Sequence, residues 1–163
     1  MSRFLAFLLG LIGAVGASQA PGYTQQYLQN LTGRVDELRM IVERFDDQMA
    51  MINLTRRDGL KQCSATGDTV ALALCDGINE DVVRYENLDG QLRALNAASD
   101  WERPVLLARN FDRQIAESAY DAYEPAVPVS LAGGAFALAG FALFWGVGAF
   151  IFGLIGSIFG RGY

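Results

Sequence analysis

Histidine is absent from this 163-residue sequence, and cysteine occurs only twice. Histidine is the commonest general base and the commonest metal ligand in proteins. The side chain on which most hydrolases and zinc enzymes depend is therefore missing. The sequence also shows no recognisable pair of a nucleophilic side chain and a base that would activate it. We therefore predict a non-enzymatic protein without catalytic, cofactor-binding or metal-binding residues and without a cofactor.

Charge is almost absent from both ends of the chain. All eighteen acidic residues lie between Arg34 and Glu124, together with eleven of the thirteen basic residues. The middle therefore has a net charge of 11 − 18 = −7, and only Arg3 and Arg161 lie outside it. An acidic middle without a basic patch is repelled by phosphates, which excludes nucleic acid as a partner.

The N-terminal end is an apolar run from residue 4 to 17, preceded by Arg3 and followed by small residues. This pattern is typical of a cleaved secretory signal, and equally of a retained signal anchor. We predict a retained transmembrane helix over residues 1–20.

A longer uncharged run covers 31 residues, from 129 to 159. As a helix rising about 1.5 Å per residue it exceeds a hydrocarbon core of about 30 Å. Pro125 and Pro128 mark its start, because a proline disfavours the helical conformation of the residue before it. Arg161 and Tyr163 lie where interfacial anchors are expected. The sequence predicts a second transmembrane helix over residues 128–163.

Two spans place both termini on one side of a membrane. Arg3 and Arg161 flank the spans on that side, so the positive-inside rule assigns the termini to the cytoplasm. The predicted location is the bacterial inner membrane, with residues 21–127 in the periplasm.

Small residues recur along both predicted spans at alternating intervals of three and four. Such a seam permits close backbone approach between membrane helices. The N-terminal seam is Ala6, Gly10, Gly13, Ala17 and Ala20, and the C-terminal seam is Ala132, Ala135, Ala139, Ala142, Gly146, Ala149, Gly153, Gly156 and Gly160. The simplest interpretation is antiparallel packing of the two spans within one chain. The alternative is that the longer seam packs against a second protomer or another membrane protein.

Between the spans, the apolar residues follow helical periods throughout. Those from Leu28 to Ile52 alternate by three and four, which is typical of a coiled-coil seam. A break at Asn53, a short helix to about Ala65 and a second long helix after Asp68 then predict an antiparallel hairpin. Shorter helices follow, the first introduced by a capping box at residues 99–102. The predicted fold is all-α: two transmembrane helices flanking an extramembrane antiparallel helical hairpin or coiled-coil bundle.

Cys63 and Cys75 lie on either side of the turn between the short helix and the second long helix. In an oxidising periplasm they are candidates for a disulfide, and two buried free thiols are the alternative. The acidic pairs Asp46-Asp47 and Glu80-Asp81 are neighbours on helices. Adjacent residues on a helix do not face each other, so we interpret these pairs as solvated surface.

Three runs resemble a known family. They are LLGLIGAVGASQAPGYTQQYLQNLTGRVDELR at residues 8–39, RYENLDGQL at 84–92 and LLARNFDRQIAESAYDAYEPAVPVS at 106–130. Together with the final apolar helix they resemble the DUF2937 family of proteobacterial membrane proteins. The resemblance covers nearly the whole chain and implies an uncharacterised inner-membrane protein. It implies no catalytic residue, and it favours retention of the N-terminal span.

We therefore expect a structural or accessory protein of the inner membrane, acting as a scaffold or as a subunit of a membrane assembly. The expected partners are the lipid bilayer and another membrane protein or a second copy of the chain in an oligomer. The competing hypothesis is a periplasmic lipid- or peptide-binding module tethered to the membrane. Its groove would be lined by Leu106, Leu107, Phe111 and Ile115.

Overall fold

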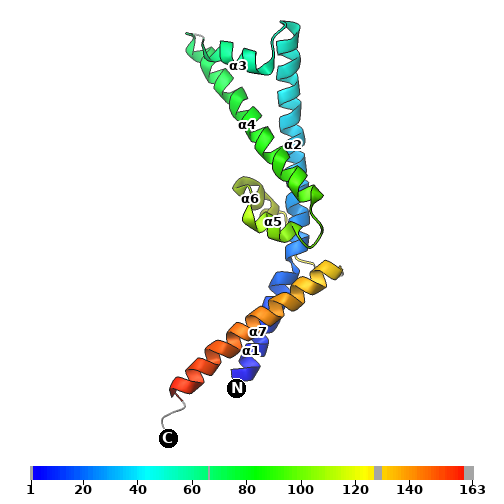
Figure 1. The fold of residues 1–163 in the computed structure, drawn as a ribbon, viewed down its shortest axis with the longest axis vertical. Coiled ribbons are helices and arrows are strands. Elements are labelled where there is room, and N and C mark those ends of the chain that lie inside the picture. Colours follow the sequence, from blue (N-terminus) through cyan, green and yellow to red (C-terminus); the bar gives the residue numbers. More distant parts are fainter. Residues whose placement is uncertain (1, 66, 127–129, 160–163) are drawn as a thin grey trace. The chain divides into compact units, whose positions relative to one another are not determined.

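The computed structural model describes residues 2–65, 67–126 and 130–159. These residues form seven helices and no strand, which confirms the all-α prediction (Figure 1). The helices are α1 (Ser2–Ser18), α2 (Ala20–Met51), α3 (Arg56–Ser64), α4 (Thr69–Ala97), α5 (Arg103–Arg109), α6 (Arg113–Asp121) and α7 (Leu131–Phe159). Four residues named in the predictions above lie outside the described residues: Pro128, Gly160, Arg161 and Tyr163.

The chain divides into two compact units. The first comprises residues 1–26, 98–109 and 119–163, and the second comprises residues 27–97 and 110–118. The expected three segments, 1–20, 21–127 and 128–163, follow the chain order, whereas the units combine distant parts of it. Residues 98–109 thus belong with the two apolar helices, although they lie between them in sequence.

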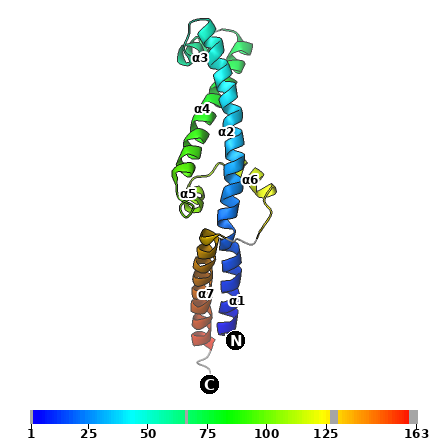
Figure 2. The same ribbon diagram turned by 90° about the vertical axis from the view of Figure 1, so that its right-hand side faces the viewer.

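In the first unit, α1 and α7 lie side by side and run in opposite directions, as Figures 1 and 2 both show. Among the described residues, two helical runs are long and apolar enough to cross a membrane: Arg3–Met51, which contains α1 and α2, and Leu131–Ile155 within α7. Only Gln19 interrupts the run between α1 and α2. Pro21 falls in the first turn of α2, where its missing N–H leaves no helical hydrogen bond unmade.

The second unit contains the long hairpin. From Tyr27 onward, α2 runs in the opposite direction to α4. The short helix α3 lies between the C-terminal end of α2 and the N-terminal end of α4 (Figure 1). Buried residues on the two helices follow the expected apolar faces: Leu28, Leu31, Val35, Leu38 and Val42 on α2, and Val82, Leu88, Leu92 and Leu95 on α4. Ile52 and Leu74, expected on the same faces, are exposed near the α3 end. Pairing of α2 as a coiled coil remains a prediction.

Local side-chain chemistry sets the helix boundaries around α3 and α4. Asn53, just after the end of α2, adopts φ +57°. Asparagine tolerates this left-handed conformation better than most residues. Thr55 then caps α3 by accepting a hydrogen bond from the Asp58 amide. Asp68 accepts hydrogen bonds from the Val70 and Ala71 amides, which caps α4. The predicted short helix and its cap are therefore confirmed.

The predicted capping box at the start of α5 is also present in part. The Ser99 amide donates to Glu102 Oε2 at 3.0 Å, and the Ser99 hydroxyl donates to the same oxygen at 2.7 Å. Hydrogen bonds from the Ser99 hydroxyl and amide lower the pKa of Glu102, because both favour the carboxylate. Pro104 lies in the first turn of α5.

A buried tyrosine joins three segments of the second unit. The Tyr27 side chain is fully buried, and its hydroxyl donates to Gln91 Oε1 at 2.8 Å and accepts from the Asp112 amide at 2.8 Å. Gln91 in turn donates to the Asn110 carbonyl oxygen at 2.7 Å. Asp112 caps α6 by accepting from the Ile115 amide, and it also pairs with Arg84. This network fixes where α6 begins relative to α2 and α4.

We expect Tyr27→Phe to destabilise the second unit by about 1 kcal/mol, because it leaves the partly buried Asp112 amide and Gln91 amide oxygen without their partner. Thermal unfolding of the full chain in mild detergent, followed by circular dichroism, measures the effect. Tyr85→Phe is the matched control, since the Tyr85 hydroxyl only accepts a long hydrogen bond of 3.4 Å from Arg39. Equal melting temperatures for the two variants would contradict a structural role for the Tyr27 network.

Candidate functional site

The small residues of α1 meet α7 at very short range. Ala6, Gly10 and Gly13 are buried, and Ala17 is half-buried. A Cβ added to Gly10 would lie 2.8 Å from the Phe141 ring, and a Cβ added to Gly13 would lie 2.6 Å from the Phe144 ring. The absence of these Cβ atoms therefore lets the aromatic rings of α7 lie directly on the α1 backbone.

On α7, a different set of glycines makes the reciprocal contact. A Cβ on Gly140 would collide with the Gly13 carbonyl oxygen and with the Ala17 side chain. A Cβ on Gly148 would lie 3.2 Å from Ala6 Cα. The rings of Phe7 and Phe141 pack edge to face across the pair, with centroids 5.6 Å apart. Close backbone approach at Gly140 and Gly148 is thus combined with aromatic packing between them.

The seam predicted on α7 is not the face that contacts α1. Ala139, Ala142, Gly146, Ala149 and Gly153 are all exposed, and a Cβ at Gly146 or Gly153 would have no neighbour within 4 Å. Ala142 follows Gly140 by two residues, which is about 200° around a helix of 3.6 residues per turn. The expectation that this seam packs against the N-terminal span is therefore wrong for these five residues, which we call the open face of α7.

The remaining seam residues are buried or half-buried, apart from those whose side chains are not described. Ala132 is buried and Ala135 is half-buried at the start of α7, while Ala20 is half-buried at the start of α2. The surroundings of Gly156 lie outside the part of the chain that the structure describes. The series Gly133, Gly140 and Gly148, at intervals of seven and eight, was the sequence signal for the true contact face. It was hidden by the longer and more regular seam on the opposite side.

A polar contact that the sequence analysis missed ties the return segment to the end of α1. Tyr123, after α6, donates its hydroxyl hydrogen to Gln19 Oε1 at 2.9 Å, and the Ala126 amide donates to the same oxygen at 3.3 Å. The Tyr123 ring packs edge to face on Tyr23 at a centroid distance of 5.9 Å. A Cβ on Gly22 would lie 3.0 Å from the Tyr123 hydroxyl oxygen, so glycine leaves room for the ring.

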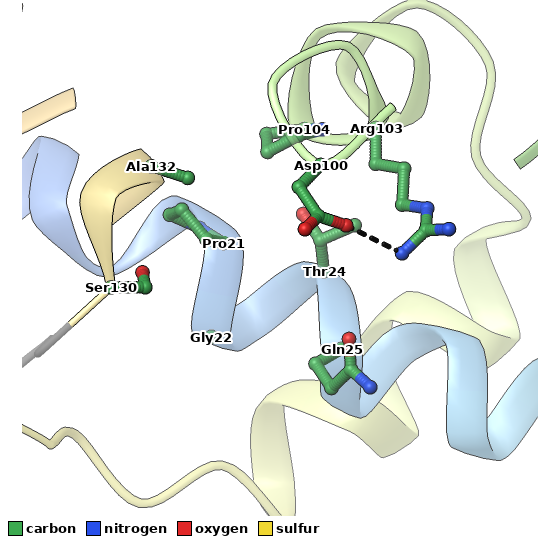
Figure 3. A pocket seen from close by; sticks show the side chains of 9 residues that line it. All are labelled: Pro21, Gly22, Thr24, Gln25, Asp100, Arg103, Pro104, Ser130 and Ala132. Atoms are coloured by element: carbon green, nitrogen blue, oxygen red, sulfur yellow. Dashed lines mark hydrogen bonds and ion pairs between the residues drawn. The ribbon is translucent and has the colours of Figure 1, made fainter. Parts of the chain in front are cut away.

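A cavity of about 270 Å³, lined by both charged and apolar residues, lies within the same unit, where α2 and α7 begin. Figure 3 shows the Asp100 and Arg103 side chains on one side of it, joined by a 2.9 Å ion pair, and Pro21 and Ser130 on the other. Gln25 and the largely buried Thr24 also line the cavity. Arg103 is the more enclosed partner of the pair, with 27% of its side chain exposed against 77% for Asp100.

Cys63 in α3 and Cys75 in α4 form a disulfide, with Cα atoms 6.1 Å apart. This separation lies within the range that a disulfide spans, and the bond closes the turn between the two helices. α3 also contacts α2 in two ways: a Cβ added to Gly59 would collide with the Met49 side chain, and Arg56 donates to both carboxylate oxygens of Asp46. The hydrogen bond from Arg56 lowers the pKa of Asp46, so this carboxyl group is held in its charged form.

Of the residues expected to line a groove for a lipid or peptide, Leu107 and Ile115 are buried and Phe111 is exposed. Among the described residues, no group of three or more Cys, Asp or Glu side chains is placed to hold a metal ion. Asp46 acts as the partner of Arg56, and the structure places it in no such cluster.

We expect Gly13→Leu to separate α1 from α7, because the new side chain would occupy the positions of the Phe144 ring and the Gly140 carbonyl; overpacking of this kind costs about 1–3 kcal/mol. A cysteine pair at Ala6 and Gly148 reports the contact, since Cβ atoms at these positions would lie 3.4 Å apart and suit a disulfide. In a background with Cys63 and Cys75 changed to serine, oxidation should give an intrachain disulfide.

Gly13→Leu should abolish that disulfide, and Gly146→Leu on the open face should preserve it. Electrophoretic mobility and mass before and after reduction measure both outcomes. Loss of the bond in both variants, or in neither, would contradict the assignment of the two faces.

Comparison with known proteins gives one match. The model of a family described as "Protein of unknown function (DUF2937)" matches residues 1–161. No curated protein and no solved structure matches the chain. The family match extends over both apolar helices and everything between them, so the chain belongs to the DUF2937 family.

Proposed function

We propose that this protein is a non-enzymatic structural or accessory protein of the bacterial inner membrane. In this proposal, α1 and α7 cross the bilayer as an antiparallel pair, and the open face of α7 packs against a further membrane helix. That helix belongs to another membrane protein or to a second copy of the chain. The helical hairpin of the second unit is the part presented outside the membrane.

The exposed surface of the α1–α7 pair supports a membrane location. Large apolar side chains point away from the pair on both helices, with exposed fractions of 66% for Phe4, 72% for Leu138 and 67% for Phe150. The described part of α1 has one charged residue, Arg3, and the described part of α7 has none. A soluble protein rarely exposes so continuous an apolar surface, whereas lipid tails cover it without cost.

The observation that carries the proposal is the open face of α7. Contact with α1 uses Gly140 and Gly148, and the five small residues of the open face lie on the opposite side of the helix. In lipid, a flat strip of Gly and Ala gains little by facing acyl chains, but it lets another backbone approach closely. A second helix on this face would therefore complete the packing that α1 begins on the other.

The disulfide supports a periplasmic location of the hairpin. Disulfides persist in oxidising compartments and are rare in the bacterial cytosol. Cys63 and Cys75 both lie in the second unit, and Arg3, at the N-terminal end of α1, satisfies the positive-inside rule if the N-terminus is cytoplasmic. Both features favour the same orientation.

Crosslinking from the open face tests the proposed association. A photoreactive maleimide attached to Gly146→Cys in intact membranes should give an adduct with another chain, because the new side chain points toward the proposed partner. Val147→Cys is the matched control: Val147 is exposed, is one residue further on, and lies about 100° around the helix.

The mass of the adduct distinguishes the partners. Twice the mass of the chain identifies a second copy, and any other mass identifies a different protein. Equal adduct formation from the two positions, or adducts from Val147→Cys alone, would contradict an interface on the open face.

The orientation is tested by thiol labelling in whole cells. Cys63→Ser leaves Cys75 as a free thiol, and a membrane-impermeant maleimide should label it in intact cells. A cysteine at Ser2, in a background without Cys63 and Cys75, should be labelled only after the membranes are permeabilised. The reverse pattern would place the hairpin in the cytoplasm.

A further inference from the structure

The cavity beside Asp100 and Arg103 combines charged side chains with an otherwise largely apolar lining. Its two charged side chains have opposite sign and lie 2.9 Å apart, so the cavity presents one cation and one anion to a ligand. A ligand with a single charge would gain from one of them and be opposed by the other. The pair instead matches a ligand that carries an anion and a cation close together.

The lining selects among zwitterionic ligands. A phosphate accepts charge-assisted hydrogen bonds from the Arg103 guanidinium, and the Gln25 amide and Ser130 hydroxyl can add further donors. A primary ammonium group has three N–H donors for the Asp100 carboxylate, whereas a trimethylated ammonium has none and is usually held by aromatic rings. None of the described residues that line the cavity is aromatic (Figure 3). These features favour an ethanolamine headgroup over choline.

The position of the cavity within the first unit indicates a membrane lipid as the source. Pro21 and Ser130, which line it, lie just beyond the end of α1 and just before the start of α7. If these helices cross the bilayer, the cavity lies at the level of the headgroups on one side. A volume of about 270 Å³ is at the low end for a small-molecule site, enough for a headgroup but not for acyl chains.

We propose that this cavity binds the headgroup of phosphatidylethanolamine, with Arg103 on the phosphate and Asp100 on the ammonium group. The site rests on the proposed membrane-spanning function. On binding, the Arg103–Asp100 ion pair would be exchanged for contacts of Arg103 with the phosphate and of Asp100 with the ammonium group. The bound lipid would then hold α5 at the membrane surface beside the ends of the apolar helix pair.

Native mass spectrometry of the full chain tests the site. The protein is released from detergent micelles that contain equal amounts of palmitoyl-oleoyl phosphatidylethanolamine and the corresponding phosphatidylglycerol. The wild type should retain one phosphatidylethanolamine in preference to phosphatidylglycerol. Arg103→Gln should reduce retention of both lipids about tenfold, since it removes the charged donor to phosphate.

Asp100→Asn gives a sharper result. It removes the acceptor for the ammonium group and keeps Arg103, so both lipids should be retained equally. Arg113→Gln is the matched control, because Arg113 forms an exposed 2.8 Å ion pair with Glu117 and does not line the cavity. Helix content by circular dichroism confirms that each variant is folded.

Three outcomes decide the matter. Equal retention of the two lipids by the wild type, or unchanged retention by Arg103→Gln, would overturn the headgroup site while leaving the proposed function intact. Release of the chain from membranes by alkaline carbonate would overturn the membrane-spanning function and the site with it. Loss of the phosphatidylethanolamine preference in Asp100→Asn, but not in Arg113→Gln, supports the assignment.

Discussion

The backbone contact between Gly13 and Gly140 sets the geometry of the first unit. At this point neither helix has room for a Cβ, and the rings of Phe141 and Phe144 pack over Gly10 and Gly13 on the same face. Lipid provides little hydrophobic drive for helices to associate, so the pair depends on the van der Waals contact that glycine permits. Because aromatic rings fill the grooves over the α1 glycines, the contact needs small residues on only part of the α7 face.

This asymmetry explains why the open face of α7 has no partner among the described residues of the chain. A helix that met α1 through small residues alone would have used its longest small-residue seam. Instead, α7 presents rings and isolated glycines to α1, and its regular strip of Gly and Ala faces outward. Under the proposed function the two faces of α7 have different roles. One packs against α1 of the same chain, and the other packs against a partner helix.

The sequence predicted the elements well because each is set by local chemistry. The caps at Thr55, Asp68 and Ser99 and the apolar periods of α2 and α4 depend only on nearby residues. It was harder to predict which face of a helix contacts which neighbour, and which distant residues come into contact. Periodicity showed that α7 has a small-residue seam but not which neighbour it meets. The Gln19–Tyr123 and Tyr27–Asp112 contacts join residues 104 and 85 positions apart, and no local pattern marks such pairs.

The acidic groups of the protein show how its polar chemistry is used. The pKa values of Asp46 and Glu102 are lowered, in both cases chiefly by hydrogen bonds that fix a helix end or join two helices. A general acid working near neutral pH requires the opposite shift, usually from burial or a neighbouring carboxylate. Asp112 is likewise occupied by a helix cap and by Arg84. These carboxylates hold helices in place, which agrees with a protein whose proposed role is to position other molecules at the membrane.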